Sequence, residues 1–168
     1  MKGVHLVVMG VAGCGKSEAG GHIAGKLGLP LVEGDHFHPQ RNIDKMKLGV
    51  ALDDADRADW LLVLGAELGR RPAGAVMTCS ALKAAYRDTL RKAAPGLRFV
   101  HLAITQAESL RRVGSRPGHF YPPSLVASQF EALQDPAGEE GVLVVDGTLS
   151  LPEIAGRVAG WLNSTIRN

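Results

Sequence analysis

Short apolar runs alternate with longer amphipathic stretches along most of the chain. The apolar runs predict strands at Val4–Met9, Pro30–Glu33, Ala75–Cys79, Phe99–Leu102 and Val142–Val145. The amphipathic stretches predict helices at Lys16–Leu27, Asp53–Leu68, Lys83–Ala94, Gln106–Val113, Pro123–Leu133 and Leu151–Leu162. Because the apolar runs show no polar alternation, we expect helices to cover both faces of the sheet. The pattern predicts a three-layer α/β fold with a five-stranded parallel sheet.

Two segments, Gly34–Leu52 and Gly114–Pro122, fall outside this alternation and are expected to be irregular. Both are rich in Gly, Pro, His and basic residues. Long irregular segments in a compact domain commonly act as binding loops or lids. We therefore expect residues 34–52 to bind an acceptor and residues 114–122 to form a lid. A plain surface excursion is the alternative for each segment.

Composition supports one ordered globular domain spanning residues 1–168. Hydrophobic residues make up 45% of the 168 residues and charged residues 21%, which excludes a disordered chain. Lys and Arg number 19 and Asp and Glu 17, so the formal net charge is only +2. A general nucleic-acid-binding protein usually carries a much larger basic excess, and we expect no nucleic-acid partner.

The chain has two cysteines, Cys14 and Cys79, and no CxxC pair. This excludes a disulfide framework, a zinc ribbon and a thioredoxin-type site. The apolar run at the start of the sequence is too short for a signal peptide or a membrane span. We expect a cytoplasmic protein with reduced thiols and no membrane partner.

The strongest motif is Gly10-Val11-Ala12-Gly13-Cys14-Gly15-Lys16-Ser17, which matches G-x-x-x-x-G-K-[ST]. A buried strand is predicted before it and a helix after it, which is the context of a phosphate-binding loop. The glycines allow backbone N–H groups to converge on phosphate oxygens at a helix N-terminus. We expect all eight residues to bind nucleotide. Lys16 would contact the β- and γ-phosphates, and the Ser17 hydroxyl would hold Mg²⁺.

Carboxylates that end apolar strands are the next candidates for chemistry. The guanine-reading N/TKxD motif is missing, so a GTPase is excluded. Asp35 and Asp146 each follow a predicted strand. Asp35 is predicted to be the general base and to bind the acceptor, since it opens the segment 34–52. For Asp146, a role beside the nucleotide and a simple turn cap remain open.

The segment 34–52 is crowded with hydrogen-bond donors, including His38, Arg41, Asn42 and Lys45. Such a set suits a small, polyhydroxylated, acidic acceptor, although an exposed basic loop is the alternative. His36 and His38 have the spacing of a metal pair but lack a nearby third ligand, so we do not expect a metal there. In the second segment, Arg116 is expected to stabilise charge on the transferring phosphoryl group, unless it lies in a solvated basic turn.

A series of ordered motifs resembles one family, the gluconate kinases (gluconokinases) of the small P-loop type. The resemblance covers nearly the whole chain. Its motifs are Met9-Gly10-Val11, Gly34-Asp35-x-x-His38-Pro39, Asn42-Ile43-x-Lys45-Met46, Leu52-x-Asp54-x-Asp56-Arg57-x-x-Trp60-Leu61, Cys79-Ser80-Ala81-Leu82-Lys83-x-x-Tyr86-Arg87, Arg116-x-Gly118-His119-Phe120 and Gln129-Phe130-Glu131-x-Leu133-Gln134-x-Pro136.

The resemblance implies a fold like that of shikimate and nucleoside monophosphate kinases. It implies transfer of the γ-phosphate of ATP to the 6-hydroxyl of D-gluconate, with Mg²⁺, a mobile lid and a homodimer. Asp35 is then the base, and the acceptor side consists of Asp35, His38, Lys45, Arg57, Ser80 and Lys83. Arg112 and Arg116 belong to the nucleotide and lid side. The alternatives are a kinase of the same fold acting on shikimate or another small polyol, and a nucleotide-binding regulator that transfers no phosphate.

Overall fold

The structure is a computed structural model that describes residues 3–115 and 122–167. Within these residues, five parallel strands form one sheet in the order β2-β3-β1-β4-β5. The strands are β1 (Val4–Met9), β2 (Leu31–Glu33), β3 (Gly74–Thr78), β4 (Arg98–Ala103) and β5 (Val142–Asp146). The predicted parallel α/β sheet is therefore confirmed: the bounds of β1 match the prediction, and those of the other four strands differ from it by one residue at one or both ends.

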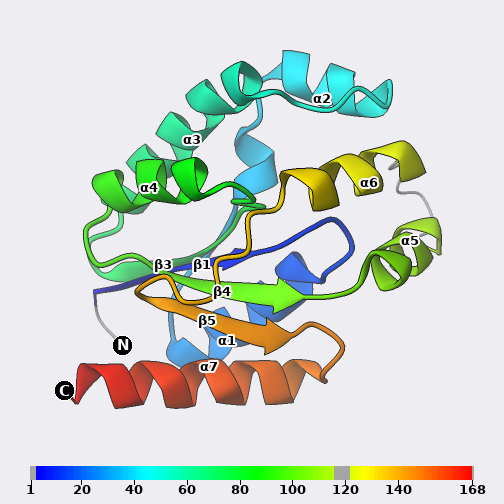
Figure 1. Ribbon diagram of the computed structural model, residues 1–168. Coiled ribbons are helices and arrows are strands. Elements are labelled where there is room, and N and C mark those ends of the chain that lie inside the picture. Colours follow the sequence, from blue (N-terminus) through cyan, green and yellow to red (C-terminus); the bar gives the residue numbers. More distant parts are fainter. Residues whose placement is uncertain (1–2, 116–121, 168) are drawn as a thin grey trace.

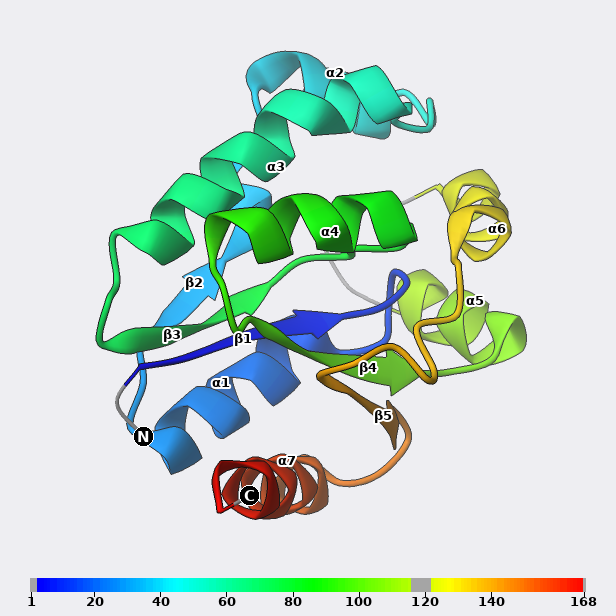
Figure 2. The same cartoon turned by 60° about the vertical axis from the view of Figure 1, so that its left-hand side comes forward.

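Helices cover both faces of the sheet (Figures 1 and 2). On one face lie α1 (Lys16–Leu27) and α7 (Leu151–Ile166), and on the other lie α3 (Asp54–Gly69) and α4 (Ala84–Ala93). Three shorter helices lie beyond these layers: α2 (Gln40–Lys47), α5 (Gln106–Gly114) and α6 (Pro123–Ala132). The result is the expected three-layer arrangement of helices, sheet and helices.

The sheet separates two hydrophobic cores, and β1 contributes to both of them. Leu6 and Val8 pack on the α1 and α7 side, whereas Val7 and Met9 pack on the α3 and α4 side. All four side chains are fully buried. Successive side chains of a strand point to opposite faces, so a central parallel strand must be apolar at every position. This requirement explains why β1 is an uninterrupted apolar run apart from His5.

The segment 34–52 is largely helical, which corrects the prediction of an irregular loop. It contains a 3₁₀ turn, η1 (Gly34–Phe37), followed by α2. Pro39 stands at the N-cap of α2, and the side chain of Gln40 bonds Asp44 one turn later at 2.8 Å. The one fully buried side chain of α2 is Asn42. The helix has only two large apolar residues, Ile43 and Met46, so its apolar stripe is short and the sequence pattern missed it.

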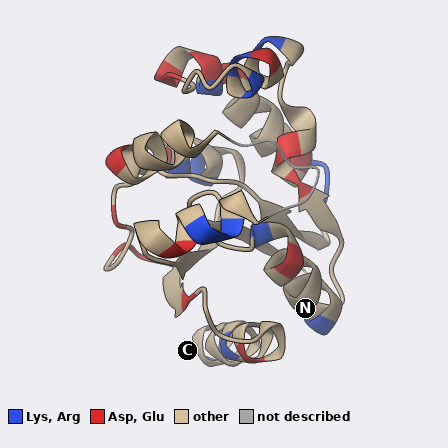
Figure 3. Ribbon diagram, turned by 90° about the vertical axis from the view of Figure 1, so that its right-hand side faces the viewer, with Lys and Arg blue, Asp and Glu red and all other residues tan. Residues whose placement is uncertain are grey.

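The carboxyl ends of the strands meet at one edge of the sheet, where the turn after β1, η1, α5 and α6 also lie (Figure 1). Figure 3 faces this edge and shows acidic and basic positions interspersed along the bordering helices. This is the edge at which open α/β sheets bind ligands. Of the helices in the described part of the chain, none is long and apolar enough to cross a lipid bilayer.

Candidate active site

The turn from β1 to α1 has the backbone of an anion cradle. Gly10, Gly13 and Gly15 have φ values of 146°, 76° and 92°. A Cβ on Gly10 would lie 2.7 Å from the sulfur of Cys14, so the tight turn excludes a side chain there. Gly15 is the N-cap of α1, and no side chain caps the first turn of that helix. The N–H groups of that turn therefore remain available to an anion, where the helix dipole favours negative charge.

Lys16 folds back over this turn. Its ammonium group donates hydrogen bonds to the carbonyls of Gly10 at 3.0 Å and Val11 at 3.2 Å. The side chains of Val11 and Cys14 are buried in the core on the α1 side, so these two residues can offer a nucleotide phosphate only their backbone. The loop thus presents one cation and a set of backbone dipoles, as the motif predicts.

Contacts from α5 and α6 fix the outer side of the loop. The Ser109 hydroxyl donates to the carbonyl of Ala12 at 2.6 Å, and the N–H of Ala12 donates to the Gln129 side chain at 2.7 Å. Arg112 donates to the carbonyls of Gly13 at 3.1 Å and Gly147 at 3.0 Å. Arg112 therefore joins the phosphate loop to the turn after β5, in keeping with its prediction as a nucleotide-side residue. Sequence reasoning did not assign roles to Ser109 and Gln129.

The carboxylate nearest to Ser17 belongs to Glu33, which was not among the predicted site residues. The Ser17 hydroxyl donates to Oε2 of Glu33 at 3.0 Å, and the Thr78 hydroxyl donates to the same oxygen at 2.6 Å. Thr78 in turn accepts a hydrogen bond from the N–H of Gly34 at 3.2 Å. A hydroxyl and a carboxylate oxygen beside a phosphate loop are the hard ligands that Mg²⁺ prefers. This donor set fits the predicted Mg²⁺, and direct binding of the ion by Ser17 stays a prediction.

Asp35 lies in η1, immediately after the end of β2. Its side chain is 79% exposed, and Nε2 of His38 lies 3.6 Å from its carboxylate. The interaction with His38 lowers the pKa of Asp35, and the positive charge of Lys16 lowers it further against the effect of partial desolvation. The carboxylate therefore stands ionised, open to solvent and within the electrostatic reach of the phosphate loop.

His38 is held in one orientation by the residues around it. Its ring stacks on Trp60 with centroids 4.0 Å apart, and Nδ2 of Asn42 lies 3.3 Å from its Nδ1. The Trp60 indole donates to the carbonyl of Gly34 at 2.9 Å, which ties the same stack to η1. Because the amide of Asn42 donates to Nδ1, the neutral ring carries its proton on Nε2. That N–H faces Asp35.

Three predicted acceptor-side cations, Lys45, Lys83 and Arg57, come from α2, the N-cap of α4 and α3. Lys45 pairs with Asp56 at 2.7 Å, and Lys83 pairs with Asp54 at 2.9 Å. The Arg57 guanidinium lies 5.5 Å from the ring centroid of Tyr86, and its buried Nε has no hydrogen-bond partner among the described residues.

The charges that act on the Cys79 thiol show which of these groups lie near it. Burial raises the pKa of Cys79 to about 12, and the charges of Asp35, Lys16 and Arg57 all act on that thiol. A Coulomb interaction weakens as the distance between the two groups grows, so groups whose charges act on this thiol lie near it. The predicted base, the phosphate-loop lysine and an acceptor-side arginine thus converge on the carboxyl end of β3. The thiol stays protonated and is no nucleophile.

The remaining predicted residues divide into three cases. The Ser80 carbonyl accepts a hydrogen bond from the N–H of Gly10 at 3.2 Å, which places Ser80 beside the phosphate loop. Asp146 caps the turn after β5 by accepting from the Thr148 N–H and hydroxyl at 2.8 and 2.7 Å, in agreement with the cap alternative.

Arg116 lies outside the described residues, as does most of the predicted lid. The described residues hold no cluster of His, Cys, Asp or Glu fit for a metal, around His36 or elsewhere.

Curated relatives match this chain over most of its length. A gluconokinase from Gluconobacter oxydans is 43% identical over 145 residues, covering 84% of this chain and 82% of its own. The thermoresistant gluconokinase of Escherichia coli is 41% identical over 144 residues, covering 83% and 82% of the two chains. No protein-family model matches the chain.

Solved structures show the same relationship. A gluconokinase from Sinorhizobium meliloti superposes with a TM-score of 0.86 at 43% identity, covering 97% of both chains. A shikimate kinase from Acinetobacter baumannii superposes with a TM-score of 0.65 at 19% identity, covering 96% of this chain and 94% of its own, and shows the fold alone. Sequence identity above 40% over four fifths of the chain, together with this fold, means that the protein is a kinase that belongs to the gluconokinase family.

Proposed function

We propose that this kinase transfers the γ-phosphate of ATP to the 6-hydroxyl of D-gluconate, giving ADP and 6-phospho-D-gluconate. The observation that carries the proposal is Asp35, an ionised and exposed carboxylate beside His38 and within the electrostatic reach of Lys16 in the phosphate loop. The relatives named gluconokinase supply the identity of the acceptor.

On the nucleotide side, the backbone N–H groups of Gly13 and residues 15–17 and the Lys16 ammonium bind the phosphates, while the N–H groups of Gly10 and Ala12 hold the loop through Ser80 and Gln129. Lys16 already lies over the loop, so it needs only to exchange carbonyl partners for phosphate oxygens. Ser17 would hold Mg²⁺, with Glu33 orienting the Ser17 hydroxyl. When bound, the ion neutralises charge on the phosphate oxygens. Arg112 fixes the loop from the outside and borders the nucleotide.

Asp35 acts as the general base. The 6-hydroxyl oxygen attacks the γ-phosphorus, the bond from that phosphorus to the β,γ-bridging oxygen breaks, and the hydroxyl proton passes to the Asp35 carboxylate. The lowered pKa keeps Asp35 ionised at neutral pH, so it orients the hydroxyl and accepts the proton late in the reaction. His38, whose Nε2 lies 3.6 Å from the Asp35 carboxylate, stabilises the ionised form of that carboxylate.

The acceptor carboxylate and hydroxyls are bound by His38, Lys45, Arg57, Ser80 and Lys83. The free Nε of Arg57 is suited to an acidic acceptor, because a buried guanidinium N–H without a partner gains most from a carboxylate. Arg116 remains a prediction for the lid, where its charge would offset the charge developing on the transferred group.

A coupled ADP-release assay tests the proposal against a panel of D-gluconate, other sugar acids, small polyols, shikimate and nucleoside monophosphates. We expect turnover with gluconate well above that with the others, and a loss of about 10²–10⁴ in kcat on Asp35→Asn with ATP affinity retained. Nearly equal turnover across the panel would instead support a broader polyol kinase. Tight ATP binding without any phosphorylated product would support the non-catalytic regulator.

Three further expectations accompany this function. We propose a single domain over residues 1–168, working in the cytoplasm as a homodimer. The two buried, free cysteines suit a reducing compartment. The dimer rests on the family resemblance, and sedimentation equilibrium at micromolar concentration tests it: a monomer mass would reject the dimer.

A further inference from the structure

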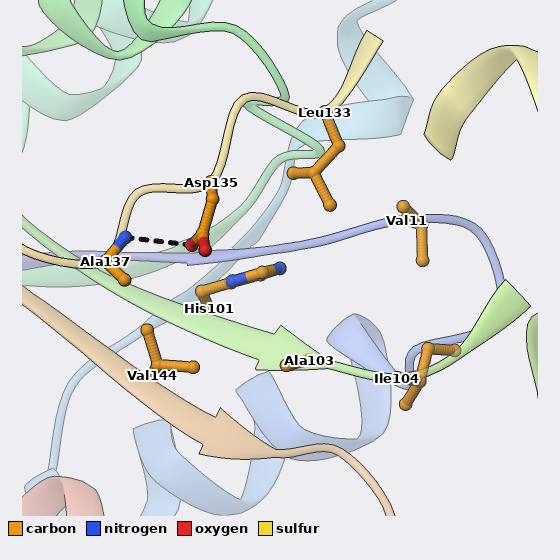
Figure 4. Close-up of a pocket in the computed structure, with 8 residues that line it drawn as sticks. All are labelled: Val11, His101, Ala103, Ile104, Leu133, Asp135, Ala137 and Val144. Carbon is orange, nitrogen blue, oxygen red and sulfur yellow. Dashed lines mark hydrogen bonds between the residues drawn. The ribbon is translucent and has the colours of Figure 1, made fainter. Parts of the chain in front are cut away.

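A cleft of about 340 Å³ opens beside β4 and the segment that joins α6 to β5 (Figure 4). Its walls are mostly apolar and are formed by Val11, Ala103, Ile104, Leu133, Ala137 and Val144. Two polar side chains, His101 and Asp135, complete the lining. A partly enclosed space of this size, with apolar walls and few polar groups, has the makeup of a small-molecule site.

His101 is the unusual member of this lining. It lies in the middle of β4, is only 5% exposed, and neither ring nitrogen has a hydrogen-bond partner in the described part of the chain. Figure 4 shows the ring extending from β4 into the space between Leu133, Val11 and Ala103. A buried polar group without a partner is costly, so a molecule that satisfies the ring gains free energy on binding.

The cleft is separate from the predicted active site. Val100 and Leu102, the neighbours of His101 on β4, pack on the α1 side, so His101 faces the opposite side of the sheet. Val11 is the one lining residue that the predicted site also contains, and Val11 contributes its side chain to the core. An occupant of the cleft would therefore contact the Val11 side chain without entering the nucleotide-binding side of the phosphate loop.

We propose that this cleft binds a small, neutral molecule with an apolar body and one hydroxyl group, which hydrogen-bonds to the ring of His101. Burial lowers the pKa of His101, so the neutral ring offers one N–H donor and one acceptor nitrogen. A hydroxyl can serve either nitrogen, since it both donates and accepts. The Asp135 carboxylate, which already accepts from the N–H of Ala137 at 3.0 Å, disfavours an anion.

Phenol is the probe, and toluene is its match without the hydroxyl. Binding is followed by NMR through the ring nitrogen and Cε1–H signals of His101 in isotope-labelled protein, without nucleotide or gluconate. The result is thus independent of the proposed function. We expect the His101 signals to shift saturably with phenol. Toluene should bind about three- to tenfold more weakly, because it lacks the one neutral hydrogen bond that phenol makes.

Two variants and one control make the test specific. His101→Leu should abolish the preference for phenol, as followed by the neighbouring backbone amides. Val144→Trp places a large side chain from a partly exposed position of edge strand β5 into the cleft, and should abolish binding while keeping His101. His22→Gln changes an exposed histidine on α1 and should bind phenol as the parent does.

Four results would overturn the proposal: a shift that does not saturate, equal affinity for phenol and toluene, phenol binding that survives Val144→Trp in a folded variant, or a crystal soaked in phenol in which ordered water still occupies both ring nitrogens of His101.

Discussion

The hydroxyl of Ser17 donates a hydrogen bond of 3.0 Å to the carboxylate of Glu33, and so joins the first turn of α1 to the end of β2. The Thr78 hydroxyl, at the end of the neighbouring strand, donates to the same carboxylate oxygen. Two strands and one helix therefore fix the direction of the Ser17 hydroxyl. Groups that orient a metal ligand in this way commonly change metal affinity when they are replaced.

Glu33→Gln should raise the Mg²⁺ concentration that gives half-maximal activity by about tenfold or more. The amide keeps the size of the side chain but removes the negative charge beside the ion. The measurement is the rate of ADP release across a magnesium titration at saturating ATP and gluconate. Glu18→Gln is the matched control, because Glu18 is an exposed carboxylate in the same turn of α1. An unchanged magnesium requirement in Glu33→Gln would remove Glu33 from the metal site.

Lys16→Met should lower kcat by about 10²–10³, since one contact to the developing charge in a preorganised site has this effect. The fold should persist, because the Lys16 ammonium bonds only to two carbonyls of the loop among the oxygen acceptors in the described structure. Steady-state kinetics and thermal unfolding measure the two effects. Lys26→Met, at an exposed position in the last turn of the same helix, should leave both unchanged. Turnover near the parent's level would contradict the assignment of the loop.

The sequence was sufficient for the elements that depend on local pattern. Buried parallel strands must be apolar at every position, which made β1 and β3 readable directly. The phosphate loop is contiguous, so its spacing alone predicted the cradle. In contrast, α2 is anchored by a buried Asn42 and not by an apolar stripe. Two large apolar residues in a helix of eight make too short a periodic pattern to set it apart from a loop.

The residues that sequence reasoning missed act across long separations. Glu33 meets Thr78 because β2 and β3 pair in a register that sets these two residues side by side. Ser109 and Gln129 reach Ala12 from positions 97 and 117 residues away. Strand register and helix packing determine these contacts, and no local sequence motif encodes either of them. The one sequence signal for Glu33 was its position at the end of a predicted apolar strand. The prediction instead chose Asp35, two residues later, as the functional carboxylate.

His38→Gln should raise the pKa of the Asp35 carboxyl toward its ordinary value of 3.8. His38 is the main group that lowers this pKa in the folded protein. The lowered pKa contributes stability above the ordinary value, and that contribution is lost as the pH falls through the folded-state pKa. Carbon-13 NMR of the carboxyl signals across an acid titration measures the shift. His22→Gln, an exposed control, should not move it. A pKa that stays unchanged in His38→Gln would show that Lys16 dominates.

Glu139→Gln should lower the free energy of unfolding by roughly 1–3 kcal/mol at neutral pH, because it leaves the charge of Arg87 with carbonyl partners only. Arg87 is fully buried and pairs with Glu139 at 2.6 Å. That pairing lowers the pKa of Glu139 below its ordinary 4.5, so its stabilising effect is complete above that value and fades as the pH falls through the lowered pKa. The free energies of unfolding of the parent and the variant, measured in urea, should therefore differ at pH 7 and converge at low pH.

Glu140→Gln, an exposed neighbour, should match the parent throughout. A parent-to-variant difference that stays constant into acid would mean that the loss comes from packing and not from the ion pair.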